Sequence, residues 1–165
     1  MVVVDSSVII HLARVGRLLL LKECFGAIII SKGVYSETAE APDKIFGKTE
    51  IRKACGEWIK IADAGDKKSV EKILESEQIE PTDAELLVIA KEQKDILLTN
   101  DFLLVQVARA AGVECYWPTT FALKCVKKKI ISRAEAKELL FQLINAGMRL
   151  KIEVYAAILK KIDEV

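Results

Sequence analysis

The stretch MVVVDSSVII (residues 1–10) places a carboxylate, Asp5, directly after three consecutive valines. A run of β-branched residues that ends at a polar residue is typical of a buried strand. The apolar residues after Ser6 and Ser7 have the pattern of a helix, so Asp5 stands at a junction between a strand and a helix. At such a junction the carboxylate could cap the helix, or it could serve a site at the end of the strand.

Four further strand-like runs follow, and helical periodicity fills most of the chain between them. The runs cover residues 27–30, 58–62, 95–98 and 113–116, and 58–62 is the weakest. Strands that alternate with helices are typical of βαβ units, whose strands are parallel. The sequence therefore predicts an α/β fold with a central parallel sheet of four or five strands.

The chain changes character from Pro118 onward, where only helical patterns remain. These patterns cover residues 119–127, 133–145 and 151–162. We expect residues 1–117 to form the α/β domain and residues 118–165 to form a helical extension packed on that domain. The apolar stripe of the extension could face the rest of the chain, or it could face a second copy or a partner.

The composition describes one compact domain with a hydrophobic core. The chain has 165 residues, of which 52% are hydrophobic and 30% charged, and no apolar run is long enough to span a membrane. Because the first residues lead directly into a strand without an export signal, we expect a cytoplasmic protein. The four cysteines lack metal-binding spacing and are expected to be reduced thiols. The net charge of +1 neither requires nor excludes a nucleic-acid partner.

Four acidic residues stand where a site at the edge of a parallel sheet would need them. Asp5 and Asp101 follow strand-like runs. Glu37 lies on the helix after the second strand, and Asp83 opens the helix that begins PTDAEL. Each could be an ordinary helix cap, first-turn acid or exposed helix residue. Because ligands of open α/β sheets bind beyond the carboxyl ends of the strands, all four could instead point into one crevice.

A cluster of carboxylates in one crevice would need protons or a cation. Two unit charges ~4 Å apart repel by about 4 kcal/mol at an effective dielectric constant of roughly 20. With no His or Cys nearby, an all-oxygen set of ligands suits Mg²⁺ or Mn²⁺ rather than zinc. The hydroxyl and amide groups of the short polar neighbours could orient the carboxylates or bind metal waters, or they could cap helices. These neighbours are Ser6, Ser7, Thr99 and Asn100.

Four motifs contain the acids described above: VVVDSSVI (2–9), VYSETAE (34–40), PTDAELLVIAKE (81–92) and ILLTNDFLLVQVARAAGV (96–113). In this order and spacing, they resemble the PIN-domain family, the nuclease fold of VapC-type toxins in toxin–antitoxin pairs. The tail also resembles that of a prokaryotic PIN subfamily with extra C-terminal helices. The resemblance implies a three-layer α/β/α fold and hydrolysis of RNA phosphodiester bonds.

The resemblance also implies a role for each matched acid. Asp5, Glu37, Asp83 and Asp101 would form an acidic quartet that binds Mg²⁺ or Mn²⁺ and supports catalysis. Glu85 is an alternative to Asp83, because members of the subfamily sometimes carry an acid at that position. The implied partners are an RNA substrate, a cognate antitoxin and a second copy of the chain.

Basic residues around the crevice would bind the substrate, and His11 is expected to be structural. The candidates are Lys32, Lys44, Lys48, Arg52 and Arg109.

Two alternatives to a nuclease remain from the sequence. One is a PIN fold that binds RNA or protein without cutting it. The other is a phosphoryl-transfer protein that is phosphorylated on the aspartate after its first strand. That class would need another acid beside Asp5, and the chain has Ser7 there.

Overall fold

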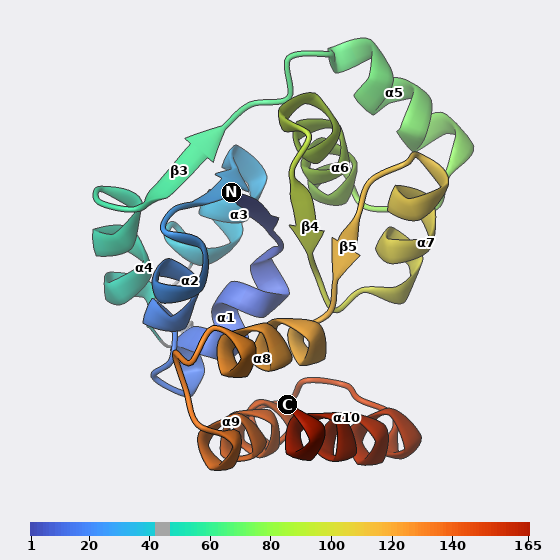
Figure 1. Ribbon diagram of the computed structural model, residues 1–165. Helices are drawn as coiled ribbons and strands as arrows, with labels where there is room; N and C mark the ends of the chain where they lie inside the picture. The colour runs from blue at the N-terminus through green and yellow to red at the C-terminus, as the bar shows by residue number, and fades with distance from the viewer. Residues whose placement is uncertain (42–46) are drawn as a thin grey trace.

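The computed structural model describes residues 1–41 and 47–165. Its five strands form one parallel sheet in the order β3-β2-β1-β4-β5 (Figure 1). The strands are β1 (Val2–Val4), β2 (Ile28–Ser31), β3 (Ile59–Ala62), β4 (Ile96–Leu98) and β5 (Cys115–Tyr116). The predicted α/β class with a central parallel sheet is confirmed.

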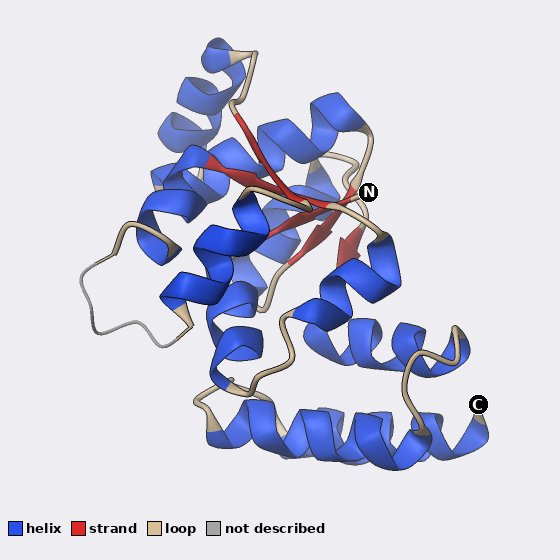
Figure 2. Ribbon diagram, turned by 90° about the vertical axis from the view of Figure 1, so that its left-hand side faces the viewer, coloured by secondary structure: helices blue, strands red, loops and turns tan. Residues whose placement is uncertain are grey.

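Helices cover both faces of the sheet and give the fold three layers (Figure 2). They are α1 (Ser6–Arg14), α2 (Leu19–Phe25), α3 (Lys32–Thr38), α4 (Lys48–Cys55), α5 (Lys67–Ser76), α6 (Pro81–Gln93), α7 (Phe102–Ala110), α8 (Pro118–Lys127), α9 (Arg133–Asn145) and α10 (Ile152–Glu164). Within the described residues, no helix has the length and apolar character needed to cross a membrane.

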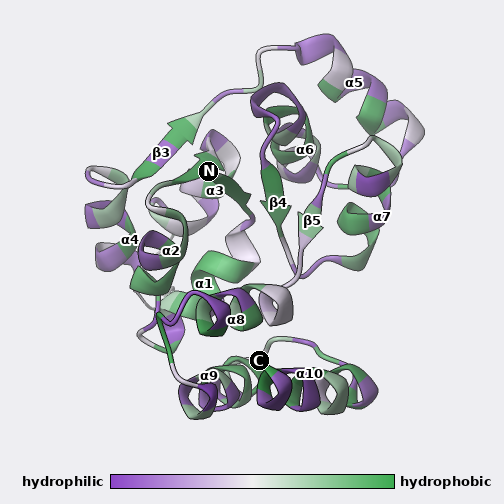
Figure 3. Cartoon of the chain, in the orientation of Figure 1, coloured by the Kyte–Doolittle hydropathy of each residue, from purple (hydrophilic) through white to green (hydrophobic). Residues whose placement is uncertain are grey.

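Strand β1 lies at the centre of the sheet, between β2 and β4. All three of its valines are buried, and the strand has the hydrophobic colour in Figure 3. Val4 pairs in parallel with Leu98 of β4, and the amide of Asp5 donates a hydrogen bond to the Leu98 carbonyl at 3.1 Å. The carboxyl ends of β1 and β4 therefore lie side by side, which brings together the residues that follow them.

Strand β3 is at one edge of the sheet and carries the weakest sequence pattern. Its central residues, Lys60 and Ile61, are exposed, whereas the strands of the sheet centre are buried. An edge strand pairs along one side only, so its sequence needs less apolar character. Its position explains why the run at 58–62 predicts a strand less strongly than the other runs do.

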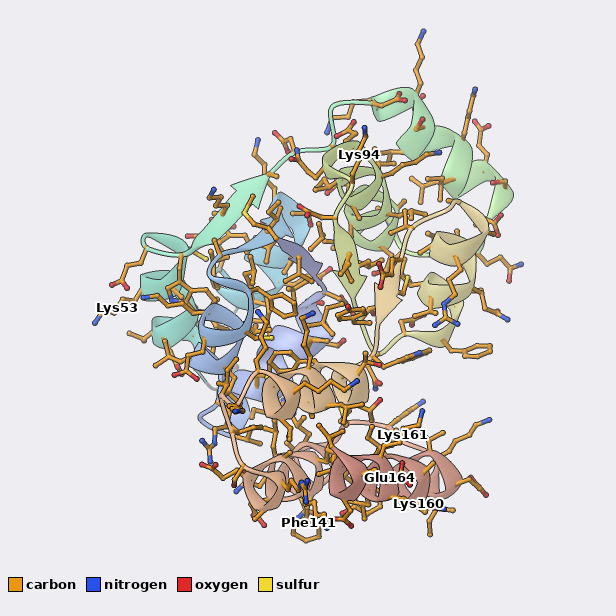
Figure 4. The ribbon with its side chains drawn as sticks, in the orientation of Figure 1. Lys53, Lys94, Phe141, Lys160, Lys161 and Glu164 are labelled. Carbon is orange, nitrogen blue, oxygen red and sulfur yellow. The ribbon has the colours of Figure 1, made fainter. Side chains whose placement is uncertain are left out.

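Helices α8, α9 and α10 pack on one another and on the α/β part of the chain. Phe121 of α8 stacks on Phe25 of α2 at 5.8 Å between ring centroids, and Leu140 and Ile162 are fully buried in the same core. The apolar stripe of the extension thus faces its own chain. Phe141 points outward from α9 and is 51% exposed (Figure 4). The division of the chain after residue 117 stays a prediction.

Gly47 allows the start of α4 to approach α1 closely. Its φ of +83° lies in the left-handed region, and a Cβ at this position would lie 2.6 Å from the Cβ of Ala13. Gly47→Ala is expected to lower the free energy of unfolding by about 2–4 kcal/mol, because backbone strain adds to overpacking. Chemical denaturation measures this change.

Gly56→Ala is the matched control at the other end of α4. The φ of Gly56 is −83°, and the nearest atom to an added Cβ is the Lys53 carbonyl oxygen at an ordinary 3.5 Å. Gly56→Ala should change stability by less than about 1 kcal/mol. Equal losses in the two variants would contradict a close contact between α4 and α1.

Candidate active site

The carboxylate of Asp5 is held by hydroxyl groups at the ends of β1 and β4. Asp5 occupies the N-cap position of α1, but its side chain makes no capping hydrogen bond. Instead, one oxygen accepts hydrogen bonds from the hydroxyls of Ser7 at 2.8 Å and Thr99 at 2.9 Å, and the other accepts one from Ser6 at 3.3 Å. Asp5 is 6% exposed. Its carboxylate is therefore oriented by its neighbours and does not serve as a helix cap.

Thr99 connects Asp5 to Asp101. Its fully buried hydroxyl donates to Asp5 and accepts a hydrogen bond from the amide of Asp101 at 3.0 Å. Asp101 does cap a helix, because its Oδ1 accepts a hydrogen bond from the Leu104 amide of α7 at 2.8 Å. The Oδ2 of Asp101 makes no hydrogen bond in the described part of the chain, so this oxygen is available to bind a ligand.

Glu37 is held against the start of α6. The Thr82 hydroxyl donates a hydrogen bond to Oε1 of Glu37 at 2.9 Å. Gly33 makes this contact possible, because a Cβ on Gly33 would lie 2.8 Å from the Thr82 hydroxyl oxygen. Asp83 follows Thr82 in the first turn of α6. The close packing of α3 on α6 thus brings two of the predicted acids to the same place.

A cleft of about 380 Å³ lies at this edge of the sheet, and all four predicted acids line it. Ser6 and Asn100 also line the cleft, whereas Thr99 does not line it but donates a hydrogen bond to Asp5. The Asn100 amide contacts no carboxylate among the described residues and donates to the carbonyl of Arg149 at 3.1 Å. Of the two alternatives at the start of α6, Asp83 lines the cleft and Glu85 does not.

The acids of the cleft interact electrostatically. Burial is the largest cause that raises the pKa of Asp83, and together with the negative charges of its neighbours it brings that pKa to about 7; these neighbours are Asp5, Asp101, Glu37 and Glu80. Within the described residues, however, no three acidic, His or Cys side chains converge closely enough to hold a metal ion. The carboxylates therefore share one environment without meeting at one point.

A family model described as a PIN domain matches residues 1–164. The chain belongs to the PIN-domain family. PIN domains commonly have nuclease activity. This PIN domain is also similar to a solved domain of a functionally unknown protein from Methanocaldococcus jannaschii DSM 2661. That domain is 33% identical, with 70% of this chain and 89% of that chain covered, at a TM-score of 0.46. A comparison with curated proteins finds no match.

Three residues with titratable side chains line the cleft of the PIN domain although the sequence did not indicate them as site residues. Glu80 precedes Pro81 at the start of α6, so a systematic search for acids at helix starts would have found it. His11 was expected to be structural, and its Nδ1 does lie 2.7 Å from the Ser7 carbonyl, but the residue also lines the cleft. Arg149 comes from the connection between α9 and α10, and no local pattern marks it.

The basic residues that the sequence suggested do not line the cleft of this PIN domain in its described part. Lys32 forms an ion pair with Asp63, and the Nε of Arg52 donates to the Ala39 carbonyl at 2.7 Å. Lys44 lies outside the described residues.

Proposed function

We propose that this PIN domain is a divalent-metal-dependent endoribonuclease of the VapC toxin type. One observation carries the proposal: four acids from separate segments of the chain line one cleft at the carboxyl ends of β1 and β4. The proposed metal ligands and catalytic acids are Asp5, Glu37, Asp83 and Asp101. A cognate antitoxin and a second copy of the chain are the protein partners that this proposal includes.

The donors in the cleft fit a hard dication. Carboxylate and hydroxyl oxygens dominate the lining and no cysteine contributes to it, which suits Mg²⁺ or Mn²⁺ better than zinc. The pKa of Asp83 is raised first by burial and then by the negative charges of the neighbouring acids. Binding an ion would require the carboxylates to close further than they do here. When bound, such an ion supplies a Lewis acid and lowers the pKa of a coordinated water.

The protein's own residues orient the acids and exchange a proton. Three hydroxyl donors fix the Asp5 carboxylate, and Thr99 ties its position to the backbone of Asp101. Thr82 fixes Glu37 in the same way. In the ion-free protein Asp83, whose pKa is raised to about 7, can take up or release a proton at neutral pH, and it must lose that proton to bind an ion. Such supporting hydrogen bonds hold carboxylates in the geometry that a metal site needs.

The test is an RNA cleavage assay with purified protein from which any bound antitoxin has been removed. Single-stranded and structured RNAs are incubated with Mn²⁺, with Mg²⁺ and with EDTA. We expect cleavage within the RNA chain that requires the added metal and stops in EDTA. Cleavage that continues at the same rate in EDTA would reject the metal-dependent mechanism.

A second candidate is a PIN fold that binds RNA without cutting it. The observation that favours this candidate is that no three of the described acidic, His or Cys side chains converge to hold an ion. The same assay separates the two candidates when binding is measured beside it by fluorescence anisotropy. RNA binding with no cleavage in either metal would support the non-catalytic alternative.

A further inference from the structure

The connection between α9 and α10 is held against the cleft at three points. The Arg14 guanidinium donates to the Ala146 carbonyl at 3.1 Å, and the Asn100 amide donates to the Arg149 carbonyl at 3.1 Å. Between them, the side chain of Met148 is 3% exposed and packs beside α1 and α8. Figure 1 shows this connection between α8 and α10. Its main chain is therefore fixed at the rim of the cleft.

Arg149 is the one Lys or Arg side chain that lines the cleft in the described part of the chain. It is exposed, and its guanidinium forms no ion pair or hydrogen bond with a described residue. Among the described residues it forms no ion pair with any of the four acids. The guanidinium thus has its full set of donors available for a ligand.

We propose that Arg149 binds a phosphate of the RNA substrate in the cleft. An anionic phosphodiester is repelled by a lining of carboxylates, so one cation at the rim favours its entry and fixes its position. A guanidinium can hold phosphate oxygens with two parallel hydrogen bonds, which gives orientation as well as attraction. Asn100 is a positioning residue in this proposal, because it acts through the main chain of Arg149. The inference rests on the proposed nuclease function.

The experiment compares Arg149→Ala, Arg149→Lys and the control Lys151→Ala. Lys151 is an exposed cation two positions further along that does not line the cleft. Cleavage of a labelled single-stranded oligoribonucleotide in Mn²⁺ gives kcat and KM, and anisotropy in EDTA gives RNA affinity without turnover. We expect Arg149→Ala to lower kcat/KM by about 10- to 100-fold and to weaken RNA binding. Arg149→Lys should lower kcat/KM by a smaller factor than Arg149→Ala does. Lys151→Ala should lower kcat/KM by about twofold or less.

Two further measurements separate phosphate binding from a structural role. Mn²⁺ affinity, from electron paramagnetic resonance of the free ion, should be unchanged or tighter in Arg149→Ala, because a positive charge near the acids is removed. Asn100→Ala should lower kcat/KM in the wild-type background and lower it much less in the Arg149→Ala background. This non-additivity is expected of two residues that act through one contact.

The outcomes distinguish this inference from the nuclease proposal. If the wild-type protein neither cleaves nor binds RNA, both proposals fail. If the wild-type protein cleaves RNA and Arg149→Ala keeps its kcat/KM and RNA affinity, the role of Arg149 is wrong and the nuclease function stands. A loss of Mn²⁺ affinity and thermal stability together with activity would make Arg149 structural and also overturn the inference.

Discussion

Metal-dependent RNA cleavage is expected to fall by about 10³-fold or more when Asp5 or Asp101 is replaced by Asn. Each change removes one negative oxygen from the cleft and leaves the size of the side chain nearly unchanged. The protein should still fold, because an amide oxygen can accept the hydrogen bond from the Leu104 amide at position 101. At position 5 the amide oxygen can accept the hydrogen bonds from the hydroxyls of Ser7 and Thr99. Initial cleavage rates in Mn²⁺ measure the loss of activity, and circular dichroism measures whether the variants fold.

Asp66→Asn is the matched control for these substitutions. Asp66 also caps a helix, because its Oδ1 accepts a hydrogen bond from the Ser69 amide at 3.0 Å, but it lies outside the cleft. The same chemical change there should leave cleavage unaltered. If Asp5→Asn and Asp101→Asn retained cleavage close to that of Asp66→Asn, these carboxylates would not be the proposed ligands.

The stability of the metal-free protein should depend on pH through Asp83. Its pKa rises from 3.8 to about 7 on folding, so the folded state favours the protonated form. The resulting stabilisation is fully present below the unfolded pKa and is lost as pH rises through the folded pKa. Because Asp83 is partly exposed, solvent screening limits the effect to about 1–3 kcal/mol. Asp83→Asn should remove this pH dependence and be more stable than the wild type above neutrality.

Urea unfolding in EDTA at about pH 5 and about pH 8.5 measures the difference between the two proteins. Glu85→Gln is the control on the same helix, since Glu85 does not line the cleft. Mn²⁺ should then stabilise the wild type and stabilise Asp83→Asn less, because a ligand that binds the folded state raises its stability. A wild-type stability that tracks Asp83→Asn at both pH values would show that the cleft does not concentrate charge on Asp83.

Much of this architecture can be predicted from local patterns. The valines before Asp5 and the apolar run before Thr99 mark two buried strands, and the alternation with helices makes them parallel. Local patterns do not predict that the two strands are neighbours, because strand order depends on which helices pack on which face of the sheet. The sequence could place Asp5 and Asp101 at strand ends but could not show that β1 and β4 are neighbours.

The rest of the cleft depends on tertiary packing that no local pattern records. Glu37 reaches the start of α6 because Gly33 lets two helices approach, and the glycine alone does not reveal its partner. Arg149 reaches the cleft because Met148 is buried between helices distant in sequence. The hydroxyl of Thr99 had two equally ordinary roles in the sequence, and the structure shows its contact with Asp5.

The α9–α10 connection makes the tail one wall of the cleft, although all four acids come from the first 101 residues. A shorter chain ending near residue 117 would carry every acid and still lack the wall that holds Arg149. It would also lose α8, and with it the stacking of Phe121 on Phe25 of α2. On the proposed function, a change in the length of the α9–α10 connection would therefore alter which RNAs bind in the cleft, while the acids stay the same. Selectivity and chemistry can diverge separately in such a molecule.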